Sequence, residues 1–131
     1  MPQTRRHVSL ALAAASLVAC TPRHSIKMES QSMYGLIGKL RALPGRRDEL
    51  ASILLAGTGA MPGCLSYIIA MDAADADALW VTEVWESQGS HRASLALPAV
   101  QQAIAKGKPI IAGFGERFET APIGGVGLAR K

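Results

Sequence analysis

The feature that most constrains the fold is the order in which the hydrophobic period changes along residues 33–121. The stretch 33–42, MYGLIGKLRA, alternates between its two faces, and this period of two predicts a strand. After a Pro-Gly turn, apolar residues recur at helical spacing, which predicts a helix over 46–60. Residues 64–71 and 78–86 again follow the strand pattern. The aspartate-rich turn between them predicts an antiparallel hairpin.

The remainder of this region predicts the elements that complete a four-stranded sheet. Ser87 suits the N-cap of a short helix, and Pro98 suits the first turn of another helical stretch that ends at Gly107. Residues 109–115 are expected to form a link, and residues 116–121, ERFETA, a short final strand. The order is β-α-β-β-α-β, which is the split arrangement of ferredoxin-like α+β domains.

The first 19 residues have the composition of an export signal. Two arginines precede an apolar run from Val8 to Ala19, which is shorter than the roughly 20 residues of a permanent membrane span. The sequence LVAC at 17–20 resembles the lipobox of bacterial lipoproteins, in which the cysteine receives lipid. We therefore expect an exported protein of the cell envelope or periplasm, anchored to the membrane through Cys20. A plain signal peptide with an incidental cysteine, or an unprocessed helix, is the alternative.

Cleavage before Cys20 would leave three parts. The expected boundaries are a polar tether over 20–32, a domain over 33–121 and a flexible tail over 122–131. The formal net charge of +4 comes from the flanks, because the domain contains eight Lys or Arg against nine Asp or Glu. No basic stripe interleaved with aromatic residues is present, so nucleic acid is not an expected partner. The three histidines and two cysteines do not cluster in the sequence, and a metal site is not expected.

The stretch WVTEVWESQGSHR, residues 80–92, is the best candidate for chemistry. Strand alternation places Glu83 and Trp85 on one apolar face, where burial would raise the pKa of the carboxyl unless Arg41, Lys39 or Arg117 reaches it. Glu83 could therefore act in catalysis, form a structural ion pair, or lie at the surface. His91 is expected near the start of a helix, where it could deprotonate a phenol or simply hold a hydrogen bond.

Four stretches in this order resemble the antibiotic biosynthesis monooxygenase (ABM) domain family over residues 33–121. They are YGLIGKLRALPGRRDEL, PGCLSYIIAMD, WVTEVWES with its Glu and Trp two apart, and SHRAS with its His at a helix start. The resemblance implies a homodimer whose two sheets form an α/β-barrel, with a pocket between sheet and helices in each subunit. It also implies oxygenase chemistry on quinols or polycyclic phenols without metal, flavin or another cofactor. Related barrels that degrade haem use an Asn, and this sequence contains none.

The predicted site combines these lines of reasoning. His91 and Glu83 are the candidate catalytic residues, Trp85 and Tyr67 the aromatic walls for a quinol-like ligand, and Phe118 and Met71 the residues that fill around it. Apolar residues on both faces of the first three strands favour a covered second face, and so a dimer. The rival hypothesis is a noncatalytic dimeric barrel that binds a small hydrophobic ligand at the cell envelope. A purely structural envelope lipoprotein is the third.

Overall fold

The computed structural model describes residues 32–128, and its elements follow the predicted order. The predicted signal peptide 1–19, the proposed lipid site Cys20, the tether up to residue 31 and residues 129–131 lie outside the described residues. The elements are β1 (Tyr34–Ala42), α1 (Arg47–Gly57), β2 (Cys64–Met71), β3 (Ala78–Trp85), α2 (Gln88–Ser94), α3 (Pro98–Gly107), the 3-10 helix η1 (Lys108–Ile110) and β4 (Ile111–Thr120). Residues 121–128 form no helix or strand.

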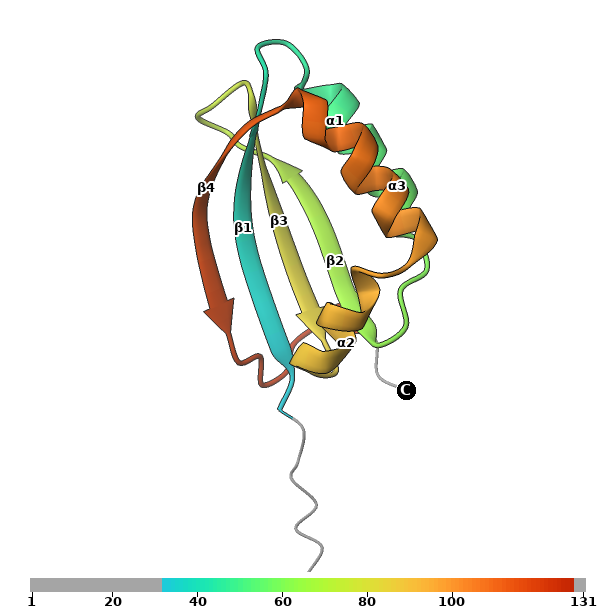
Figure 1. The fold of residues 1–131 in the computed structure, drawn as a ribbon. Coiled ribbons are helices and arrows are strands. Elements are labelled where there is room, and N and C mark those ends of the chain that lie inside the picture. Colours follow the sequence, from blue (N-terminus) through green and yellow to red (C-terminus); the bar gives the residue numbers. More distant parts are fainter. Residues whose placement is uncertain (1–31, 129–131) are drawn as a thin grey trace, which may run out of the picture.

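The four strands form one antiparallel sheet in the order β2-β3-β1-β4, with the helices packed on one side (Figure 1). We call the side that carries the helices the helix face and the opposite side the open face. Each β-α-β unit returns the chain parallel to its first strand, so β1 and β3 become the central strands. The predicted ferredoxin-like α+β fold is confirmed.

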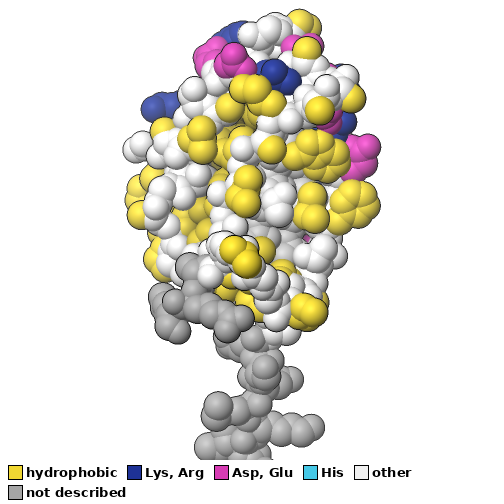
Figure 2. Space-filling view, turned by 180° about the vertical axis from the view of Figure 1, so that it is seen from behind, with side chains coloured by type: hydrophobic (Ala, Val, Ile, Leu, Met, Phe, Trp, Pro, Cys, Tyr) yellow, Lys and Arg dark blue, Asp and Glu magenta, His cyan; other side chains and the backbone are white. Residues whose placement is uncertain are grey.

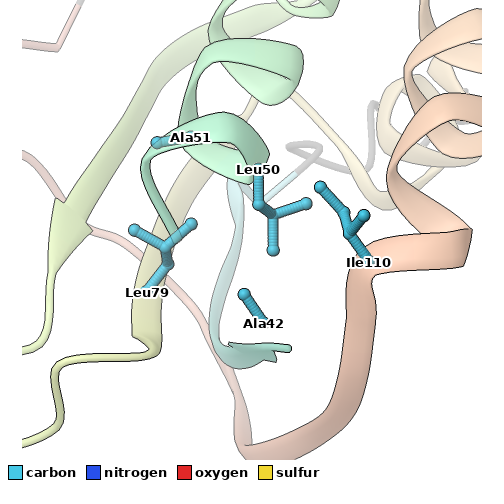
Figure 3. Packing of buried hydrophobic residues seen from close by; sticks show 5 residues of the cluster. All are labelled: Ala42, Leu50, Ala51, Leu79 and Ile110. Carbon is cyan, nitrogen blue, oxygen red and sulfur yellow. The ribbon is translucent and has the colours of Figure 1, made fainter. Parts of the chain in front are cut away.

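The core lies between the helix face and α1, because strand alternation directs every second side chain toward that helix. Leu50 of α1 and Leu79 of β3 are fully buried, and Ala42, Ala51 and Ile110 complete the cluster (Figure 3). These residues come from four elements, β1, α1, β3 and η1. The cluster therefore fixes α1 and the start of β4 against the central strands.

The sheet contains two register shifts, and one of them lies beside a stretch that was wrongly expected to be a link. The stretch 111–115, expected to be a link, is the first half of β4, and the pairing of β4 with β1 shifts register between Gly38 and Leu40. Glycines at 113 and 115 hide the strand period there, because they carry no side chain to alternate. A second shift near Leu65 places Cys64, rather than Leu65, opposite Trp85. The helix predicted over 46–60 also ends earlier, at Gly57.

The aspartate-rich turn between β2 and β3 is a fixed structure rather than a simple solvated loop. Asp72 accepts backbone hydrogen bonds from residues 74 and 75, accepts the Trp80 Nε1 donor at 2.7 Å, and pairs with Lys39 Nζ at 2.9 Å. These partners, led by Lys39, lower the pKa of the Asp72 carboxyl. Arg41 pairs with Asp75 at 2.6 Å. The Lys39 and Arg41 side chains thus pair with the aspartate-rich turn rather than with Glu83.

The open face of the sheet carries several apolar side chains that no helix or strand within residues 32–128 covers. Ile37 lies between Thr82 and Phe118 in the strand pairing, and Thr82 pairs with Ile68. Ile68 is 56% exposed and Phe118 is 54% exposed. Figure 2 shows hydrophobic side chains spread over this side and charged ones gathered toward the upper end. Within residues 32–128, no helix has the length and apolar character needed to span a membrane.

Candidate functional site

A cavity of about 310 Å³ lies on the helix face, lined by residues of all four strands and of α1. We call it the Glu83 cavity. Its walls combine aliphatic and aromatic side chains with a few ionisable ones: Leu36, Gly38, Lys39, Leu40, Leu54, Tyr67, Val81, Glu83, Leu95, Phe114, Gly115, Glu116 and Arg117. The arrangement suits a small, mostly apolar molecule that presents one or two polar groups.

Glu83 is the carboxylate that β3 directs into this cavity. The Trp85 indole donates its Nε1–H to Glu83 Oε2 at 2.8 Å, and His91 Nε2 lies 3.7 Å from the same oxygen. The Glu83 and His91 side chains are only 11% and 15% exposed. Trp85 itself is 1% exposed. Glu83 Oε2 therefore contacts an indole and an imidazole, both of which lie outside the cavity lining.

The electrostatics of the cavity favour a proton acceptor that is easily protonated. Burial raises the pKa of the Glu83 carboxyl, and the Trp85 hydrogen bond with the nearby charges of His91 and Arg117 offsets only part of that effect. Burial also raises the pKa of the Tyr67 phenol, and the negative charge of Glu83 adds to it. Tyr67 consequently stays a neutral phenol, while Glu83 takes up a proton at higher pH than an exposed glutamate does.

His91 lies behind Glu83 rather than on the cavity wall. It belongs to α2, whose N-cap Ser87 accepts a hydrogen bond from the Ser90 backbone N–H. The imidazole packs edge-on against Trp85, with ring centres 5.5 Å apart, and in a tilted arrangement against Tyr34 at 5.3 Å. His91 does not line the cavity. Any effect of His91 on a molecule in the cavity would pass through Glu83.

Arg117 of β4 is a further polar residue of the site, and its contacts with Glu119 and Tyr34 were not predicted from the sequence. Arg117 lines the cavity, and its Nη1 donates to Glu119 Oε1 at 3.1 Å. The Tyr34 hydroxyl donates to the same oxygen at 3.0 Å. The sequence places Arg117 and Glu119 on one side of their strand, but it contains no local signal for the pairing of β4 with β1. Tyr34 was predicted only as a strand residue.

The structure brings together part of the predicted set. Glu83 and Tyr67 line the cavity, and Trp85 and His91 contact Glu83 from behind. Trp85 is therefore no cavity wall, because α2 covers the end of β3 where it lies. Phe118 pairs with Ile37 and lies on the open face, and Met71, 54% exposed, ends β2 near the aspartate-rich turn. Neither Phe118 nor Met71 lines the cavity.

Residues that could hold a metal do not gather at the site. In the part of the chain that the structure describes, no group of three or more His, Cys, Asp or Glu side chains is placed to share an ion. Cys64 is a free thiol whose pKa is raised by burial and, to a smaller extent, by Glu83. Among the side chains of the cavity, Glu83 can transfer a proton and the apolar walls can bind a ligand.

Comparison with known proteins places the chain in a family. The profile described as antibiotic biosynthesis monooxygenase (ABM) matches residues 33–106. A candidate antibiotic biosynthesis monooxygenase from Chloroflexus aurantiacus is 60% identical in sequence, with a TM-score of 0.73 over 75% of this chain and 100% of that chain.

More distant crystal structures share the fold. A candidate antibiotic biosynthesis monooxygenase from Caulobacter crescentus is 20% identical, with a TM-score of 0.65 over 72% of this chain and 93% of its own. A protein from Pseudomonas aeruginosa is 17% identical, with a TM-score of 0.64 over 72% of this chain and 98% of its own. No curated protein matches the sequence. The family profile covers more than half of the chain, and the chain belongs to the antibiotic biosynthesis monooxygenase family.

Proposed function

We propose that the protein is a cofactor-independent monooxygenase that oxidises a hydroquinone or another phenolic aromatic molecule with O₂ in the Glu83 cavity. The observation that carries the proposal is a single buried carboxylate, Glu83, with a raised pKa on the wall of a largely apolar cavity. Membership of the ABM family supports the class of reaction. The apolar walls and Tyr67 suit a planar aromatic ring.

Glu83 is the proposed general base. A phenolic hydroxyl has a pKa near 10, and transfer of its proton to a carboxylate becomes easier as the pKa of the carboxyl rises. The resulting anion is electron-rich and can give one electron to O₂. Recombination of the two radicals then forms a carbon–oxygen bond. For a hydroquinone the balance closes without another reductant: hydroquinone and O₂ give a hydroxyquinone and water, and all four electrons come from the substrate.

His91 is the proposed positioning residue for Glu83. Its imidazole lies 3.7 Å from Oε2 and favours the ionised carboxylate, which must exist before it can accept a proton. Trp85 holds the same oxygen by its hydrogen bond. We thus propose Glu83 as the group that touches substrate, and His91 and Trp85 as the groups that set its orientation and charge.

Oxygen consumption by the purified protein, verified to be free of metal and flavin, tests this proposal against a panel of hydroquinones. General base catalysis contributes about 10²–10⁴-fold, so Glu83→Gln should lower kcat/KM by that order. His91→Ala should retain activity, and the acid limb of its pH–rate profile should move to higher pH. The reason is that the charge of His91, which lowers the pKa of Glu83, is removed. Glu49→Gln, an exposed glutamate of α1, is the matched control. Uptake in Glu83→Gln equal to that of the control would contradict the base assignment.

The second candidate function is a noncatalytic barrel that binds a small hydrophobic ligand. The mostly aliphatic walls of the cavity, and the position of His91 outside it, favour this alternative. It predicts saturable binding of aromatic ligands, measured by calorimetry, with oxygen uptake no faster than spontaneous autoxidation for every member of the panel.

Assembly as a homodimer is part of the proposal. Half-exposed Ile68 and Phe118 on the open face support it, because a second sheet packed there would bury both. Phe118→Glu should convert the dimer to a monomer in analytical ultracentrifugation. Leu55→Glu, a 61% exposed leucine on the helical side, is the matched control. A Phe118→Glu protein with the wild-type sedimentation coefficient would contradict this interface.

Export and lipid anchoring through Cys20 are likewise proposed, on the basis of residues 1–20. Fractionation should find the protein with membranes, and Cys20→Ser should release it. A lipid-sized mass on the N-terminal peptide is the direct measurement. Recovery of the wild-type chain in the cytoplasmic fraction, with residues 1–19 still attached, would contradict the export hypothesis.

A further inference from the structure

A second hollow lies beside the Glu83 cavity, between α1, α3, η1 and the start of β4. We call it the Ile104 groove. Its volume is about 630 Å³, and its lining residues are Leu40, Leu54, Ala103, Ile104, Gly107, Lys108, Ile111 and Phe114. Leu40, Leu54 and Phe114 also line the Glu83 cavity. The cavity and the groove are therefore adjacent and share these three side chains as walls.

The two hollows differ in chemical character. Five ionisable residues line the Glu83 cavity, whereas Lys108 is the only one that lines the Ile104 groove. Ile104 is 47% exposed and Phe114 is 78% exposed, so two large apolar side chains of the groove remain accessible to solvent. Exposed apolar surface of this kind marks a place that gains free energy when an apolar group covers it.

We propose that the Ile104 groove is a subsite for an apolar side chain of the substrate. The substrate class is then a phenol or hydroquinone that carries an alkyl or prenyl chain, with its ring near Glu83 and its chain beyond Leu40, Leu54 and Phe114. This inference rests on the proposed function for the place of the ring. It adds the part of the substrate that determines affinity.

The position of the groove decides between this occupant and a second copy of the chain. The groove lies on the helix face, whereas the uncovered sheet surface with Ile68 and Phe118 lies on the open face. A second sheet packed on the open face leaves the groove uncovered. Continuity with the Glu83 cavity through three shared walls also suits a molecule that extends from one hollow to the other.

Phe114 is the specificity-determining residue in this arrangement. It stands between Gly113 and Gly115, and it lines both hollows. Glycines allow the backbone on either side of it to adjust more than other residues would. The Phe114 ring can therefore separate the two hollows when a short substrate binds, or lie along the chain of a longer one.

The test is a series of hydroquinones with alkyl chains of increasing length, titrated into the full protein by calorimetry under anaerobic conditions so that no turnover occurs. Each buried methylene should tighten binding about fourfold until the groove is filled. Ile104→Asp should bring the affinities of long-chain and short-chain ligands close together. Leu55→Asp, which changes an exposed leucine of α1 that lines neither hollow, should leave the chain-length dependence unchanged.

The possible results separate this inference from the proposed function. Chain-length dependence that persists in Glu83→Gln while oxygen uptake is lost supports both. A binding affinity that depends on chain length, in a wild-type protein that consumes no oxygen, supports the subsite and contradicts the proposed catalysis. The subsite is overturned if the affinity of the wild type does not change with the length of the alkyl chain. It is also overturned if the affinity depends on chain length as strongly in Ile104→Asp as in the wild type. If Ile104→Asp does not fold, Ile104→Trp should shorten the chain length at which affinity stops rising. Loss of self-association in Ile104 variants would make the groove an interface and overturn the inference.

Discussion

Replacing Trp85 by Phe isolates one interaction at the centre of the candidate site. The substitution keeps an aromatic ring but removes the Nε1–H that donates to Glu83 Oε2 at 2.8 Å. Because Trp85 is 1% exposed, water does not readily replace the lost donor. The carboxylate of Glu83 then keeps His91, at 3.7 Å, as its nearest polar partner. The expected result is a further rise in the pKa of Glu83.

The size of the rise follows from the difference between the two protonation states. A hydrogen bond to a charged group contributes about 1.5–3 kcal/mol, and one between neutral groups about 0.5–1.5 kcal/mol. Removing the donor therefore costs the ionised carboxylate roughly 1–1.5 kcal/mol more than the neutral acid. Since one pKa unit corresponds to about 1.36 kcal/mol, the pKa of Glu83 should rise by about one unit.

Carbon-13 NMR of side-chain carboxyl groups measures this shift directly. The Glu83 signal is the one missing from the spectrum of Glu83→Gln. Trp80→Phe is the matched control, because its indole donates to Asp72 Oδ2 at 2.7 Å through an equivalent bond near the turn. That control should raise the pKa of Asp72 and leave that of Glu83 unchanged. An unchanged or lower pKa of Glu83 in Trp85→Phe would refute the reasoning.

Three further predictions concern stability. The pKa of Glu83 is raised in the folded state, so the free energy of unfolding of the wild type should fall relative to that of Glu83→Gln as pH rises from about 4 through that pKa. Urea unfolding of both proteins across this range measures the difference. A difference that stays constant with pH would contradict the prediction. Leu50→Ala should cost about 2–5 kcal/mol in the same assay, because Leu50 is fully buried. Gly63→Ala should cost about 1–3 kcal/mol, because Gly63 has φ +78° and an added Cβ would lie 2.6 Å from Ser90 Oγ. Gly59→Ala, in open space, is its control.

The order of elements could be predicted from the sequence because helical and strand periods are local properties. The face shared by Glu83 and Trp85 was predicted for the same reason, and the strand pairing confirms it. Ser87 and Pro98 marked the helix starts correctly, since capping and proline preferences act on neighbouring residues.

The composition of the cavity could be predicted only in part, because it depends on contacts between distant segments. Trp85 is on the predicted face, yet its depth depends on α2 covering the end of β3. Phe118 was predicted to point away from Arg117 and Glu119, and it does. Which of those two sides faces the helices depends on how β4 pairs with β1, and no local pattern carries that information.

The register shift in β4 has a consequence for how this site can change during evolution. Phe114 and Arg117 are three residues apart, an odd spacing that would normally put them on opposite sides of a strand, yet both line the Glu83 cavity. The extra residue makes one strand supply an aromatic ring and a cation to the same hollow while Phe118 remains on the open face. A substitution can change the side chain at each of these positions, but it leaves the position on the same face of the sheet. An insertion or deletion near the shift would exchange the side chains on the helix face and the open face along the rest of the strand. Under the proposed function and the proposed dimer, substrate preference and assembly would both depend on the length of this one segment.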